Sequence, residues 1–390
     1  MMSKRKFTLS LVTLVMILTL TVGLVQAQTD LPPIFKELPD PGQIPFRDEV
    51  NPQLVQPIGL DAGVVQPVSP INVNVYTPTP RFYFTRSFEV DRYRIEIMSG
   101  STGQVITVTG AGTCDGWYCY LQPTTALKPY DYAGTGGVFA WRVQARNKDG
   151  SWQNFSTYNI FFVLSKGFNS TFDANKKGWI ELRDTWSLTS KGFLKTLGSA
   201  PLTYPSVLHK DLVFNFDYSV TMKRKSSTFY NALIVWGYPN PLNTNGYWDD
   251  GIYFAYANGG VYYIYMYKDG SFSTIQSATT TSAIKKNDWN TLRVVGNSPY
   301  LDFWINGKYL GWTNLNTIGY VNDLGYLGIT MAKDPAGGDA LLVDKANSKS
   351  DVLRIQLDHD PAMELRSEPV DAVEPDLFPS LNFGDPTGTR

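Results

Sequence analysis

The chain has 390 residues, 43% of them hydrophobic and 14% aromatic, which is enough to bury the cores of two domains. Its 34 basic and 35 acidic residues leave a formal net charge of −1, which excludes the strongly basic surface of a nucleic-acid-binding protein. With only 2 cysteines and 2 histidines, neither a histidine-based metal site nor a Ser/His/Asp triad is expected.

The first 27 residues have the features of a secretory signal peptide. Lys4-Arg5-Lys6 form a basic start, residues 7–25 are apolar, and Val25-Gln26-Ala27 fits a small-x-small cleavage site. The apolar run is long for such a peptide, so an uncleaved N-terminal anchor is the alternative. Since no later run is long and apolar enough to cross a bilayer, we expect an exported protein, secreted or at the cell surface, with no transmembrane segment in the mature chain.

Residues 28–64 are predicted to form a linker. Little hydrophobic periodicity and many prolines favour an extended spacer over a folded domain. The prolines are Pro32, Pro33, Pro39, Pro41, Pro45, Pro52 and Pro57.

Residues 65–164 are predicted to form a first β-sandwich, because short apolar runs alternate with Pro, Gly and Ser. In the clearest strand, Trp141, Val143 and Ala145 alternate with polar residues, and a turn and a further apolar strand follow. This stretch resembles the final hairpin of fibronectin type III-like domains, although Phe139 stands where that family usually has the tyrosine of its corner motif. The resemblance implies a spacer or adhesion module.

Cys114 and Cys119 are the only cysteines, and export favours a disulfide between them. The bond would close a local loop that carries Trp117 and Tyr118. A metal site needs more ligands than this pair supplies, and no histidine lies nearby in the sequence.

Residues 166–360 are predicted to form a second β-rich domain. Residues 232–237 are continuously apolar, as in a strand buried on both faces, and two tyrosine-rich runs, 251–257 and 261–267, flank a turn. No apolar pattern at helical spacing is sustained, so little helix is expected.

Residues 288–311 carry a family resemblance. Asp288-Trp-Asn-Thr-Leu-Arg-Val-Val leads, after a short turn, into Phe303-Trp-Ile-Asn-Gly and then Gly311. The pattern is similar to that of concanavalin A-like (laminin G-like) jelly-roll domains, and the similarity extends from about Phe168 to Asp360. It implies two curved antiparallel sheets that often hold carbohydrate, in a family of glycosidases, lectins and adhesion modules. The predicted fold class is therefore all-β, with two β-sandwich domains.

Asn306-Gly307 predicts a type I′ hairpin turn, because both positions of that turn require a positive φ. Trp304 and Tyr309 would then lie side by side on the face away from the core, as candidate ligand-binding residues. The expected pairs are Trp304 with Tyr309, Phe303 with Leu310, and Leu301 with Trp312.

A second hairpin, with a three-residue turn at Asn258-Gly259-Gly260, places Tyr253, Tyr263 and Tyr265 on one face. Aromatic rings stack on the C–H surfaces of sugars, so these tyrosines are candidate ligand-binding residues. The alternative is that the rings pack against a neighbouring sheet or loop, since cross-strand aromatic pairs stabilise sheets by themselves.

Trp248 and Asp249 precede that hairpin, and we expect them to form a mixed stacking and hydrogen-bonding rim. The alternative is a turn in which an aspartate caps its own backbone.

The sequence predicts that the chain is not an enzyme. Jelly-roll glucanases carry their catalytic carboxylates on one strand as E-x-D-x-x-E, and glycoside hydrolysis needs two carboxylates across the scissile bond. Between Phe168 and Asp360 the only glutamate is Glu181, and no acidic residue lies two positions from it. No catalytic residue is therefore assigned.

No cofactor is expected, although calcium stays open because related jelly rolls bind it through loop oxygens. Asp334, Asp339 and Asp344 are the candidate ligands, and solvated turns explain them equally well. Residues 361–390 are acidic and proline-rich without periodicity, as in a disordered tail.

Together these features predict an exported, non-catalytic protein that binds a polysaccharide or glycoconjugate. One alternative is a structural protein that contacts other proteins at the cell surface. The other is a sugar-active hydrolase whose carboxylates come together from distant loops.

Overall fold

A computed structural model of the chain describes residues 65–133, 136–196, 204–224, 229–239, 248, 250–268, 271–320, 324–332, 340–350 and 361–365. The chain divides into two compact units, Met1–Leu164 and Ser165–Arg390. The predicted signal peptide (1–27), the predicted linker (28–64) and residues 366–390 of the predicted tail lie outside the described residues.

The first unit contains two sheets. One has four strands in the order β1 (Pro67–Ser69), β3 (Phe82–Thr85), β7 (Tyr118–Leu121) and β6 (Thr113–Asp115). The other has five, in the order β2 (Asn74–Val75), β9 (Asn159–Val163), β8 (Val138–Asn147), β4 (Val90–Ser99) and β5 (Val105–Gly110).

The alternating residues of β8 form the core of this unit, as the period of two predicts. Trp141, Val143 and Ala145 are fully buried, and the Trp141 ring meets Phe82 edge-on at 5.0 Å. A disulfide joins Cys114 on β6 to Cys119 on β7.

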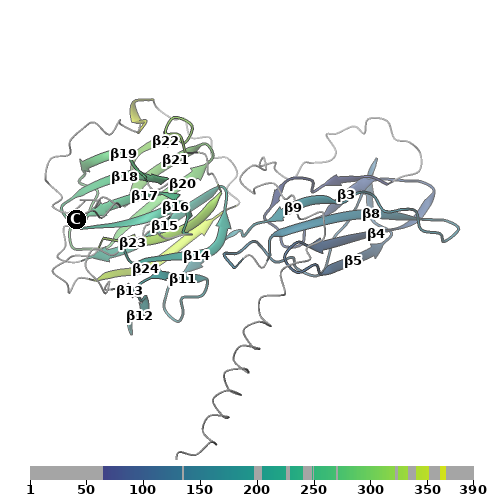
Figure 1. The fold of residues 1–390 in the computed structure, drawn as a ribbon, viewed down its shortest axis with the longest axis horizontal. Helices are drawn as coiled ribbons and strands as arrows, with labels where there is room; N and C mark the ends of the chain where they lie inside the picture. The colour runs from purple at the N-terminus through teal and green to yellow at the C-terminus, as the bar shows by residue number, and fades with distance from the viewer. Residues whose placement is uncertain are drawn as a thin grey trace, which may run out of the picture. The chain divides into compact units, whose positions relative to one another are not determined.

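The second unit is a sandwich of two antiparallel sheets (Figure 1). The first sheet has the order β12 (Ser187–Leu188), β13 (Leu194–Thr196), β24 (Leu341–Lys349), β15 (Phe216–Arg224), β20 (Asn290–Asn297), β21 (Tyr300–Ile305) and β22 (Lys308–Asn314), with β10 (Gly167–Ser170) as its eighth strand beside β24. The seven-stranded sheet has the order β11 (Trp179–Arg183), β14 (Ser206–Val213), β23 (Gly325–Met331), β16 (Tyr230–Tyr238), β17 (Asp250–Ala257), β18 (Val261–Lys268) and β19 (Ser271–Thr280).

The two sheets bury one continuous apolar core between them. Phe254 of β17 meets Phe303 of β21 edge-on at 5.2 Å, and Trp236 of β16 meets Phe216 of β15 in the same way. Alternate residues of each strand point into this core, which sends the intervening residues to the outer faces of the sheets. The predicted all-β fold with a jelly-roll sandwich is confirmed.

The register of the Asn258 hairpin is as the sequence predicts. Ala255 pairs with Tyr263 and Tyr253 with Tyr265 across β17 and β18, so the tyrosines share one face. The turn Asn-Gly-Gly explains why this register could be read from local sequence.

The Asn306-Gly307 hairpin follows the prediction only next to the turn. Trp304 pairs with Tyr309, but a β-bulge follows, so that Phe303 pairs with Gly311 and Asp302 with Trp312. The expected pairs of Phe303 with Leu310 and of Leu301 with Trp312 are wrong, because the extra residue shifts the register by one. Trp312 consequently lies on the outer face of the sheet.

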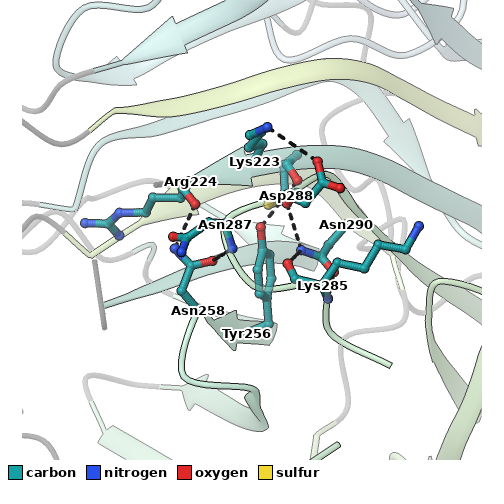
Figure 2. A network of polar contacts seen from close by, with 9 residues as sticks. Lys223, Arg224, Tyr256, Asn258, Lys285, Asn287, Asp288 and Asn290 are labelled. Atoms are coloured by element: carbon teal, nitrogen blue, oxygen red, sulfur yellow. Dashed lines mark hydrogen bonds and ion pairs between the residues drawn. The ribbon is translucent and has the colours of Figure 1, made fainter. Parts of the chain in front are cut away.

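A buried amide network fixes both hairpin turns to the loop of residues 281–290, and Figure 2 shows its part around Asn258. Asn258 donates from Nδ2 to the Arg224 carbonyl at 2.7 Å and accepts at Oδ1 from the backbone N–H of Asn287 at 3.3 Å. Asn306 donates from Nδ2 to Oδ1 of Asn290 at 2.8 Å. Because these amides are bonded inside the fold, they hold the turns in one arrangement.

The segment that follows residue 360 corrects the predicted domain boundary. The 3-10 helix η4 (Pro361–Met363) and the next residues pack on β22, where the Leu365 N–H donates to the Trp312 carbonyl at 2.6 Å. The Leu365 side chain belongs to the core and lies in space that Gly311 leaves open, because a Cβ at Gly311 would lie 3.1 Å from Leu365 Cγ and 2.6 Å from the Met363 carbonyl oxygen. Residues 361–365 are therefore part of the jelly roll and not of a disordered tail.

We expect Leu365→Ala to lower the free energy of unfolding by about 2 kcal/mol, because it removes buried methyl groups from the core. Met363→Ala is the control, since that side chain is only half-buried and should cost less than about 1 kcal/mol. Urea denaturation measures both. Equal urea midpoints for the wild type and Leu365→Ala would show that residues 361–365 do not pack on the core.

Candidate functional site

The outer face of the seven-stranded sheet carries the tyrosines that the sequence singles out. The Tyr253 and Tyr265 rings are stacked 4.8 Å apart with an interplanar angle of 11°, and the Tyr263 ring follows at 5.9 Å from Tyr265. Tyr230, from β16, meets Tyr263 and Tyr265 edge-on. The hairpin therefore brings the three predicted residues together in one aromatic cluster.

This cluster is buried, which corrects the expectation of an open platform. Tyr253, Tyr263 and Tyr265 are only 1%, 9% and 8% exposed. Burial raises the pKa of the Tyr253 and Tyr265 hydroxyls well above the ordinary value, because the charged phenolate would lose its hydration. In this arrangement the rings have little surface to offer a ligand.

Trp248 covers part of the same face and is itself fully buried, although an exposed rim was predicted. Its indole lies on Gly237 and Gly328, where a Cβ at either position would collide with the ring. Its backbone N–H donates to the Tyr253 hydroxyl at 3.1 Å. The two glycines create a flat patch that an indole can fill, a feature that alternation along single strands does not reveal. Asp249 lies outside the described residues.

The outer face of the eight-stranded sheet holds the other predicted pair, Trp304 and Tyr309. Their ring centroids are 5.1 Å apart, and both side chains are half-buried. Arg293 of β20 stands on the opposite side of Trp304, with its guanidinium carbon 4.7 Å from the ring centroid. The three side chains form a row across neighbouring strands, because each occupies an outward position in register with the next.

Two aspartates fix this row at its ends. Asp217 accepts from Nε and Nη2 of Arg293 at 2.7 and 2.8 Å, and this bidentate pair raises the pKa of the guanidinium. Asp302, which is 2% exposed, accepts from the Tyr309 hydroxyl at 2.8 Å. We call these five residues the aromatic ladder. Sequence reasoning found Trp304 and Tyr309 but missed the aspartates, whose contacts depend on the register of β15 and on the bulge in β22.

Of the three calcium candidates, only one lies in the part of the chain that the structure describes. Asp344 lies on β24, whereas Asp334 and Asp339 fall outside the described residues. Within the part of the chain that the structure describes, no group of three His, Cys, Asp or Glu side chains could hold a metal ion. None of the helices described there is long and apolar enough to span a membrane.

No protein-family model matches the chain. No curated protein matches it. Among solved structures, the carbohydrate binding module CBM66 from Bacillus subtilis is similar at 16% identity and a TM-score of 0.34, over 44% of this chain and 96% of that one. The β-glucanase of Bacillus licheniformis is similar at 13% identity and a TM-score of 0.36, over 47% and 98% of the two chains. The Crh5 transglycosylase in complex with NAG is similar at 10% identity and a TM-score of 0.37, over 48% and 86%.

This comparison overturns the prediction that the chain is not an enzyme. The β-glucanase and the transglycosylase are enzymes by name, and a further similar structure is a native glycosidic hydrolase. The prediction rested on the missing E-x-D-x-x-E pattern, which tests one placement of the carboxylates on one strand. It says nothing of carboxylates that a fold brings together from separate segments, so the non-catalytic assignment is withdrawn.

Proposed function

We propose that the jelly roll binds a polysaccharide or glycoconjugate at the aromatic ladder. The observation that carries the proposal is the pairing of Trp304 with Tyr309 on an outer sheet face, half-exposed and held in place by charged neighbours. Rings held in one orientation lose little entropy when a ligand stacks on them.

The chemistry around the rings suits a hydroxylated ligand. Aromatic surfaces pack on the C–H faces of sugars, and the Arg293 guanidinium and the Asp217 carboxylate supply a donor and an acceptor beside them. The opposite charges of these two groups largely cancel, which favours a neutral sugar over a polyanion. A single site of this kind binds weakly, so multivalent polysaccharides should be retained better than short oligosaccharides.

We also propose that the protein acts outside the cell. An export signal at residues 1–27 would place the jelly roll outside the cell, secreted or at the cell surface. The first unit, with its likeness to fibronectin type III-like domains at the β8 hairpin, would then serve as a spacer or adhesion module.

The test is affinity electrophoresis of the full chain through gels that contain a panel of polysaccharides. Trp304→Ala should weaken retention by about tenfold, which corresponds to roughly 1.4 kcal/mol. Trp117→Ala is the matched control, because that tryptophan is 57% exposed on the first unit and lies outside the ladder.

Equal retention of Trp304→Ala and the wild type, with both folded, would remove the ladder from the binding surface. No retention on any polysaccharide would instead favour a structural role through protein contacts. Reducing ends released during the same incubation would show that binding leads to cleavage.

A further inference from the structure

A pocket lies where the chain crosses from one sheet of the jelly roll to the other. β10 belongs to the eight-stranded sheet, β11 to the seven-stranded sheet, and residues 171–178 connect them. The pocket has a volume of about 340 Å³, at the small end of the range for ligand sites. Its lining comes from β10, this crossover and residues 209–210 of β14.

His209 forms the floor of the pocket together with Phe172. The imidazole is 4% exposed, stacks on Phe168 at 3.7 Å and meets Trp179 edge-on at 5.4 Å. Phe172 is 1% exposed. Because both floor residues are buried, the pocket ends at them on its inner side.

The hydrogen bonds of His209 determine which ring nitrogen carries the proton. Nδ1 accepts from the Asp211 backbone N–H at 3.4 Å, and the Asp211 carboxylate oxygen is 3.6 Å from the same nitrogen, beyond hydrogen-bond length. The neutral ring therefore carries its proton on Nε2. Nε2 faces Gly178, where a Cβ would collide with it, and it has no hydrogen-bond partner among the described residues. The imidazole that carries this N–H is one of the residues that line the pocket.

The walls of the pocket combine amides with both signs of charge. Asn169, Asp173, Asn175 and Lys177 line it and are exposed at its rim. These groups offer donors and acceptors in similar numbers, the pattern that recognises hydroxyl groups better than a phosphate or a metal ion.

The walls are also held in place. Trp179 donates from Nε1 to the Ser170 hydroxyl at 2.9 Å, which ties β11 to β10. Phe172 has a φ of 59°, a left-handed conformation that is costly for a bulky residue and is maintained here by burial of its ring. Gly192 packs against Asp173, since a Cβ there would lie 2.8 Å from Oδ1. The pocket is therefore preformed.

We propose that this pocket binds one terminal sugar unit of a glycan, with Nε2 of His209 donating to a sugar oxygen and Asp173 accepting from sugar hydroxyl groups. The ligand class rests on the proposed function, but the site is separate. The pocket is formed beside β24 and β14, whereas the aromatic ladder spans β15 and β20 to β22. Because the floor is closed, the pocket would take up the end of a glycan, whereas the ladder would contact a glycan along its length.

The test is saturation-transfer difference NMR of the full chain with methyl glycosides of glucose, galactose, mannose, fructose and N-acetylglucosamine. We expect at least one glycoside to bind, and His209→Phe and Asp173→Asn each to weaken it by at least about tenfold. His209→Phe keeps the ring stacking and removes the N–H. Trp117→Ala, a change on the first unit and outside both proposed sites, should leave binding of the same glycoside unchanged.

The proposal is overturned if no glycoside binds, if Asp173→Asn binds as the wild type does, or if Trp117→Ala abolishes binding. Since Asp173 is exposed, Asp173→Asn should fold normally. It therefore still tests the pocket if His209→Phe does not fold. If no glycoside binds, or if Asp173→Asn binds normally, the polysaccharide retention that depends on Trp304 should still be observed. Failure of the pocket and failure of the ladder are therefore distinguishable.

Discussion

Trp248→Ala should lower the free energy of unfolding by about 3–5 kcal/mol, the range for a fully buried tryptophan in a packed site. The indole lies on Gly237 and Gly328. Because glycine has no side chain, neither residue can fill the cavity that removal of the indole leaves. The same change should uncover the tyrosine cluster, because the Trp248 backbone is hydrogen-bonded to the Tyr253 hydroxyl. Trp248→Phe should cost less, since it retains part of the ring.

Urea denaturation measures the loss of stability, and nitration with tetranitromethane followed by peptide mapping measures exposure of the tyrosines. Tyr253 and Tyr265 should resist nitration in the wild type and react in Trp248→Ala under native conditions. Rapid nitration of both tyrosines in the wild type would contradict the burial described here, and would return the tyrosine face to the list of binding surfaces.

Lowering the pH from about 7 to about 4.5 should destabilise the jelly roll through His209 by on the order of 2–3 kcal/mol. Burial lowers the pKa of this imidazole from 6.5 to about 4, with Asp211 opposing the shift and Lys210 adding to it. As the pH falls, His209 is therefore protonated near pH 6.5 in the unfolded chain but only near pH 4 in the folded chain. This contribution to stability is complete above pH 6.5 and is lost as the pH falls through that interval.

The measurement compares the wild type with His209→Phe, whose ring cannot titrate. Carboxylates titrate in both proteins, so their effects cancel in the difference between the two pH profiles. The variant should lose less stability on acidification than the wild type. Parallel profiles for the two proteins would show that His209 is already protonated in the fold or exposed to water.

Local sequence was sufficient for features set by turns and by alternation. Asn258-Gly-Gly fixed the register of β17 and β18, and the period of two placed Trp141 and Phe303 in the cores of the two units. Local sequence was insufficient at β22, where the bulge moves Trp312 from the expected core position to the outer face. That bulge coincides with the close approach of Met363 to Gly311, a contact between distant parts of the chain.

The candidate sites show the same division. Trp304 and Tyr309 could be placed together because they flank a two-residue turn, whereas their aspartate partners depend on which strands pair. Burial of the tyrosine cluster could not be foreseen, since alternation gives the face of a residue but not what covers that face. The pocket at His209 is formed by two segments that lie about thirty to forty residues apart, and no spacing pattern links them.

The most direct test of the ladder is the oxidation of individual tryptophans by N-bromosuccinimide, mapped by mass spectrometry with and without a polysaccharide that retains the protein. Bound polysaccharide should slow the oxidation of Trp304 and leave Trp117 unchanged. Oxidation of Trp304 at the same rate in both samples would contradict the proposal that sugars stack on the aromatic ladder.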